Sequence, residues 1–134
     1  MLSLLVASRS SMPQLFVALG AIAAGLAVAL GAFGAHGLEG RVSPERVETF
    51  RTGVEYQMYH ALALLVVGWA VAQGWGPILH WAGYCFLVGI VIFSGTLYLL
   101  VLTDTGWLGA ITPLGGVAFI VGWALLAWAA LVGG

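Results

Sequence analysis

Four apolar runs, each long enough to cross a lipid bilayer, constrain this chain more than any other feature of its sequence. A transmembrane helix needs about 20 apolar residues to cross a hydrocarbon layer about 30 Å thick. Of the four basic and five acidic residues, all but Arg9 and Asp104 lie between Glu39 and Glu55. This pattern predicts an all-α integral membrane protein. The expected spans are residues 15–34, 56–73, 78–102 and 107–132.

Two of the three connectors are tight turns. Residues 74–77 and 103–106 pair glycine with proline or aspartate, which favours sharp reversals and makes consecutive spans antiparallel. An even number of spans places both termini on one side of an inner membrane. Three arginines in the long connector against one near the N-terminus favour termini outside the cell. The first run exceeds the usual 7 to 15 residues of a signal-peptide core, so we expect it to be a retained span.

The long first connector carries a helix of its own. Ser43 suits a helix N-cap, and Pro44 suits the first helical position, where a missing N–H costs nothing. Apolar residues then recur at spacings of 3 and 4 from Val47 to Leu65 without a change of phase. The sequence therefore predicts a single membrane domain, residues 1–134, folded as a four-helix antiparallel bundle. An additional amphipathic helical segment over about 44–55 joins spans one and two, and we expect it to run continuously into span two or to bend only slightly near Gly53.

The start of the last span has two interpretations. If Pro113 is the first helical residue, 20 residues remain for one crossing. If the helix begins near Trp107, Pro113 kinks it. The sequence leaves both open.

Small residues and tryptophans predict how the helices contact their surroundings. Ala21, Gly25 and Ala29 form a row at spacing four, the kind of surface on which membrane helices pack closely, and further small residues lie beside it: Gly20, Ala24, Ala27 and Gly31. Tryptophans near the span ends predict an aromatic belt at the lipid–water interface, on the side of the membrane where residues 74–77 turn. These are Trp69, Trp75, Trp81, Trp123 and Trp128.

Antiparallel order brings most polar side chains of the spans to one end of the bundle. On the second span Tyr56 and His60 are one turn apart, as are Ser94 and Tyr98 on the third. A shared site of His36 and His60 for a metal, a haem or a quinone headgroup is one interpretation. Two histidines without a third ligand favour ordinary structural hydrogen bonds instead, so no cofactor is expected. The candidate binding residues are His36, Tyr56, Gln57, Tyr59, His60, Ser94, Tyr98 and Thr112.

Net charge, cysteine content and the absence of catalytic motifs limit the function classes. A net charge of −1 without clustered basic residues excludes a nucleic-acid surface, and the single cysteine, Cys85, excludes an internal disulfide. The sequence shows no nucleophile–base pair, phosphate loop or zinc-protease motif, so we expect no enzyme. The leading hypothesis is a non-enzymatic binding or interaction protein of the bilayer, with a polar site at one end of the bundle. Its partner in the bilayer is a second copy, a membrane protein, a lipid headgroup or an unidentified small ligand, and the alternative is a small-molecule or ion carrier or a cofactor-binding protein.

Four segments in order along the chain resemble one family. The segments are GAFGAHGL at 31–38, TGVEYQMYHALA at 52–63, FSGTLY at 93–98 and GAITPLGG at 109–116. They are similar to the signature segments of domain-of-unknown-function family 423, small bacterial membrane proteins with transmembrane protein 256 as a eukaryotic relative. The resemblance implies a four-span protein of the bacterial inner membrane and carries no activity, substrate or cofactor.

Overall fold

The computed structural model describes residues 11–133, and every regular element in that range is helical. The all-α class is therefore confirmed. Arg9, which contributes to the predicted orientation, lies outside the described residues. The elements are α2 (Ser11–His36), α3 (Pro44–Ala72), α4 (Ile78–Gly89), the π-helix η1 (Ile90–Ser94), α5 (Gly95–Thr103), the 3₁₀ helix η2 (Gly106–Ala110) and α6 (Thr112–Gly133).

Three helical segments are long and apolar enough to cross a membrane: Ser11–His36, Ile78–Thr103 and Gly106–Gly133. The second of them joins α4, η1 and α5 into one rod. Helix α3 is 29 residues long but does not meet the same measure. Its first half continues the charged connector, and its middle carries Gln57 and His60.

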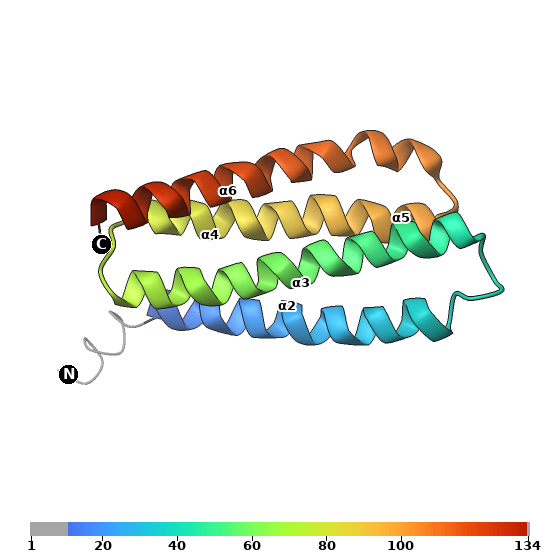
Figure 1. Cartoon of the computed structure of the whole chain (residues 1–134), viewed down its shortest axis with the longest axis horizontal. Helices are drawn as coiled ribbons and strands as arrows, with labels where there is room; N and C mark the ends of the chain where they lie inside the picture. The colour runs from blue at the N-terminus through green and yellow to red at the C-terminus, as the bar shows by residue number, and fades with distance from the viewer. Residues whose placement is uncertain (1–10, 134) are drawn as a thin grey trace.

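Four rods lie side by side and alternate in direction (Figure 1). Helix α2 packs along α3, and α4 packs along α6. Helix α3 also contacts α4, η1 and α5, so it lies between α2 and the other two rods. Helix α2 begins and α6 ends at the same end of the molecule (Figure 1).

Helix α3 begins where the sequence predicts. The Ser43 side chain accepts a hydrogen bond from the backbone N–H of Arg46 at 3.3 Å, and Pro44 is the first helical residue. The helix then runs unbroken to Ala72, so the connector segment continues into the predicted second span, as the unbroken apolar phase indicates. An ion pair between Arg46 and Asp104, 3.2 Å apart, joins this end of α3 to the turn after α5.

The two interpretations of the last span are also resolved. Helix α6 begins at Thr112, and Trp107 belongs to the preceding 3₁₀ helix. Pro113 therefore lies in the first turn, where its missing N–H leaves no helical hydrogen bond unmade.

Helices α2 and α3 meet on small residues of α2, and only part of the predicted set lies at this contact. Gly20 and Gly34 are buried against α3, and a Cβ on Gly20 would lie 2.7 Å from the Ala61 carbonyl oxygen. Gly20, Ala27 and Gly34 are seven residues apart, the spacing that keeps one row facing a partner helix in a left-handed crossing. A row at spacing four drifts around the helix. Gly20 and Ala27 belong to the predicted small residues, whereas the predicted row of Ala21, Gly25 and Ala29 is not buried: Ala21 and Ala29 are exposed, and a Cβ on Gly25 would meet open space.

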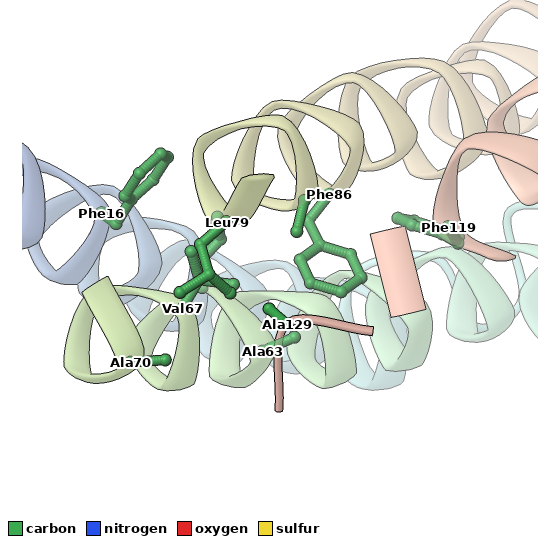
Figure 2. Close-up of a cluster of buried hydrophobic side chains, with 10 residues drawn as sticks. Phe16, Ala63, Val67, Ala70, Leu79, Phe86, Phe119 and Ala129 are labelled. Atoms are coloured by element: carbon green, nitrogen blue, oxygen red, sulfur yellow. The ribbon is translucent and has the colours of Figure 1, made fainter. Parts of the chain in front are cut away.

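The main core joins residues from all four rods. Phe16 from α2, Val67 from α3, Phe86 from α4 and Phe119 from α6 belong to one buried cluster (Figure 2). A smaller cluster lies towards the α2–α3 loop, with Leu38, Phe50, Leu100 and Val101. Most of the candidate polar residues lie between these two clusters.

Candidate functional site

Most candidate residues lie near the middle of the helices rather than at one end. Gln57 and His60 lie about 20 and 24 Å along α3 from Pro44, in a helix about 43 Å long. The Gln57 side chain donates to the Ala23 carbonyl, 2.8 Å away, near the midpoint of α2. The predicted position at one end of the bundle is therefore wrong for these two residues. The predicted span starts at Tyr56, whereas the helix starts twelve residues earlier.

Gln57, Ser94 and Tyr98 form a closed hydrogen-bonded group, here called the polar cluster. Ser94 Oγ donates to the Gly53 carbonyl at 2.6 Å, and Tyr98 Oη donates to Gln57 Oε1 at 2.6 Å. Together with the bond from Gln57 to Ala23, the cluster ties α2, α3 and the α4–α5 rod together. Every buried side-chain nitrogen and oxygen among the described residues has a partner. The side-chain polar atoms of the cluster therefore all have partners within the protein.

Gly53 makes the polar cluster possible. A Cβ at this position would lie 2.8 Å from the Tyr98 ring and 3.4 Å from Leu97 Cβ. The absent side chain lets the Tyr98 ring lie close against α3, so that its hydroxyl reaches Gln57 one turn further along the helix. The group that lies against Gly53 is therefore an aromatic ring.

The π-helix η1 positions two neighbouring side chains for different tasks. The Gly95 N–H bonds to the Ile90 carbonyl, five residues earlier, and this wider turn is typical of functional sites in helices. Within it Ser94 joins the polar cluster, while Phe93 packs against Tyr56 with ring centroids 4.6 Å apart. No pattern in the sequence predicts this turn.

Thr112 lies apart from the polar cluster and links α6 to α5. Its hydroxyl is 2.7 Å from the Thr96 hydroxyl, so the start of α6 is tied to α5. Thr96 also donates to the Ile92 carbonyl inside the π-helix at 2.6 Å. Thr112 therefore acts as a structural link at one end of α6.

His60 has both ring nitrogens occupied. Trp123 Nε1 lies 3.0 Å from His60 Nε2, and an indole N–H can only donate, so Nε2 accepts. Nδ1 then carries the proton and donates to the Tyr56 carbonyl at 2.6 Å. One face of the imidazole lies on the Phe119 ring, with centroids 3.5 Å apart and planes 7° from parallel. His60 is held in one tautomer and one orientation.

Beside His60 the surface between α3 and α6 opens into a groove of about 590 Å³, here called the aromatic groove. Phe119 is placed there because its ring covers Gly89 of α4, where a Cβ would collide with it. Gly115 similarly lets α6 approach the backbone of Phe93. The lining is mostly apolar and carries no charged side chain. It consists of Tyr56, Tyr59, His60, Phe93, Gly116, Phe119, Ile120 and Trp123.

The structure does not bring the two proposed ligand histidines together. His36 is exposed at the end of α2, about 20 Å along the helix from Ala23, and its side chain makes no hydrogen bond to a described residue. His60 lies near the level of Ala23, because Gln57, one turn away on α3, is bonded to Ala23. No three His, Cys, Asp or Glu side chains within residues 11–133 are grouped to hold a metal ion. The donors present therefore do not fit a shared metal or haem site.

Sequence reasoning missed Phe93, Phe119 and Trp123. It places Trp123 in the interfacial belt, and this is wrong, because Trp123 bonds to His60 near the middle of α3. The spacing of Phe119 and Trp123, one turn apart on α6, is the available signal for an aromatic face.

Comparison with known proteins gives a consistent family. The family model described as "Protein of unknown function (DUF423)" matches residues 30–116. "UPF0382 membrane protein YwdK" of Bacillus subtilis is 52% identical over 120 residues, covering 88% of this chain and 97% of the relative. "UPF0382 membrane protein SAB0533" of Staphylococcus aureus is 51% identical over 114 residues, 84% of this chain and 92% of the relative. No solved structure matches.

Proposed function

Because this chain belongs to the DUF423 family of membrane proteins of unknown function, we propose its role from its geometry. It is a non-enzymatic binding protein of the inner membrane with four spans, and it takes up a lipophilic ligand from the bilayer. The aromatic groove is the binding site. One observation carries the proposal: the polar cluster is closed, while the groove beside it is open and lined by aromatic rings.

Helix α3 fits the role of a fourth span despite its polar residues. Polar side chains are tolerated in a bilayer when neighbouring helices satisfy them, and Gln57 and His60 are bonded to α2 and α6 respectively. Helix α3 also packs along α2, which is long and apolar enough to cross a membrane. Four spans put both termini on one side, outside the cell by the arginine count.

The groove has the properties of a small-molecule site. Its volume falls within the 300–1,000 Å³ that is usual for ligand pockets, and its apolar lining suits a ligand dissolved in lipid. Tyr56 and Tyr59 carry the only hydroxyls among the lining residues, and neither hydroxyl has a hydrogen-bond partner among the described residues. Because no acid is paired with a base in the groove, binding is better supported than acid–base catalysis. A cofactor-binding role is less supported, since His60 has no free nitrogen.

Filling the groove tests the proposal. A Cβ on Gly116 would lie 3.9 Å from the nearest atom of the Phe93 ring, so Gly116→Leu occupies the groove without a clash at its first carbon. The matched control is Val91→Leu, at a position 72% exposed on η1. Native mass spectrometry of protein extracted in mild detergent would detect bound lipophilic molecules. We expect adducts on the wild type and on Val91→Leu, with at least a fivefold lower fraction bound in Gly116→Leu. Equal adduct fractions in all three proteins would overturn the proposal.

A further inference from the structure

We propose that the ligand of the aromatic groove is a quinone-type lipid, a flat conjugated ring with carbonyl oxygens and a hydrocarbon tail. This inference rests on the proposed function and names the class of ligand. Only binding is proposed, with no redox step. Three features of the groove support it: the orientation of its rings, its free hydroxyls and its lack of charge.

Tyr56, His60 and Phe119 form a nearly parallel stack between α3 and α6, whereas the other rings of the groove are inclined: Phe93 lies 52° from Phe119, Tyr59 58° from Tyr56 and Trp123 60° from His60. The Tyr56 ring lies within 28° of the planes of Phe93 and Phe119 and within 21° of His60. His60 and Phe119 are within 7° of parallel. A flat conjugated ring extends such a stack with favourable offset contacts. A flexible acyl chain gains nothing from parallel ring faces, so the geometry favours a planar ligand over a fatty chain.

Two tyrosine hydroxyls in the groove lack protein partners. Neither Tyr56 nor Tyr59 makes a hydrogen bond through its hydroxyl to a described residue, whereas the nearby Tyr98 hydroxyl donates to Gln57. Tyr56 and Tyr59 lie about 18 and 22 Å along α3, at the depth of its midpoint. Both side chains are exposed, and with α3 as the proposed fourth span they face lipid rather than water, where an unmet hydroxyl is costly. A phenolic hydroxyl donates well to a carbonyl oxygen, which a quinone supplies and a hydrocarbon does not.

The absence of charge argues against a phospholipid headgroup. No charged side chain lines the groove, and Glu55 is not among its lining residues although it is next to Tyr56 in the sequence. A neutral ring avoids the cost of bringing a charge to this depth. Leu114, Val117 and Ile120 are exposed along α6 beside the groove, three residues apart. This strip offers a surface for a hydrocarbon tail.

The test uses menadione, a small naphthoquinone without a tail, added to protein in phosphatidylcholine nanodiscs. Quinones quench tryptophan fluorescence on contact, and Trp123 lines the groove. We expect saturable quenching that is lost in Gly116→Leu. The variants Tyr56→Phe and Tyr59→Phe keep both rings and remove the free hydroxyls. Each should weaken the apparent affinity about fivefold to tenfold, the effect of one hydrogen bond.

Tyr84→Phe is the matched control, because Tyr84 is an exposed tyrosine whose ring contacts Phe16 and Trp81 away from the groove. It should bind menadione as the wild type does. If both groove tyrosine variants also bind like the wild type, the quinone inference is wrong. If menadione does not quench saturably while Gly116→Leu still loses lipophilic adducts, the ligand class is wrong and the proposed function stands. If neither signal depends on the groove, both fail.

Discussion

Replacing Tyr98 by phenylalanine removes one hydroxyl from the polar cluster and leaves the ring in place on Gly53. That hydroxyl donates to Gln57 Oε1 over 2.6 Å, and Gln57 is only 5% exposed. An acceptor left buried without a partner costs about 1–3 kcal/mol in proteins. Hydrogen bonds between membrane helices are worth less, about 0.6 kcal/mol on average and about 1.7 at most. We therefore expect the free energy of unfolding to fall by about 1–2 kcal/mol.

The assay is reversible unfolding in mixed micelles with a rising fraction of sodium dodecyl sulfate, followed by far-ultraviolet circular dichroism. Tyr84→Phe is the matched control, because the contacts of the Tyr84 ring are with other aromatic rings. It should change stability by less than about 0.5 kcal/mol, as exposed substitutions usually do.

A double-mutant cycle with Gln57→Leu isolates the hydrogen bond. In the Gln57→Leu background the Tyr98 hydroxyl has lost its acceptor, so its removal should cost about 0.6 to 1.7 kcal/mol less than in the wild type. An equal cost in both backgrounds would refute the assignment of this bond. A loss no larger than that of Tyr84→Phe would refute it as well.

Three further predictions test a helix contact, a helix cap and an ion pair, each by unfolding in the same micelles. Gly20→Val forces a side chain against the α3 backbone and should cost about 1–3 kcal/mol, whereas Gly25→Val meets open space and should be close to neutral. Ser43→Ala removes the N-cap of α3 and should cost about 1 kcal/mol. Asp104→Asn breaks the ion pair with Arg46, but Asp104 is 87% exposed, so we expect a loss below about 1 kcal/mol that shrinks in high salt.

The fold is predictable where local chemistry acts alone. Ser43 and Pro44 set the start of α3, and the unbroken apolar phase from Val47 to Leu65 indicates one continuous helix. The predicted span nevertheless begins at Tyr56, because apolar composition places its start. Composition locates the residue at which a helix becomes apolar. The position of that residue along the bundle depends instead on which part of the neighbouring helices packs against it. The bond between Gln57 and Ala23 supplies that information, and it joins residues 34 positions apart.

The sequence predicts the residue types of the candidate site but not its division into the polar cluster and the aromatic groove. Sequence reasoning identifies Gln57, Ser94 and Tyr98, and they do lie together. It does not identify the groove residues Phe93 and Trp123, because a hydrophobic ring in an apolar span has the same sequence signature whether it faces lipid, core or a groove. Which of these it faces is decided by helix rotation, and the π-helix changes that rotation within a single turn.

The closed and open parts of the site depend on each other through η1. Ser94 is bonded to the Gly53 carbonyl, and the residue before it, Phe93, forms part of the groove wall. Anchoring Ser94 to α3 therefore also positions Phe93 against Tyr56, which directly precedes Gln57 of the polar cluster. A wall held by buried hydrogen bonds loses little conformational entropy when a ligand binds, which favours affinity. The polar cluster thus supports binding in this proposal by holding the groove in one shape, without contacting the ligand.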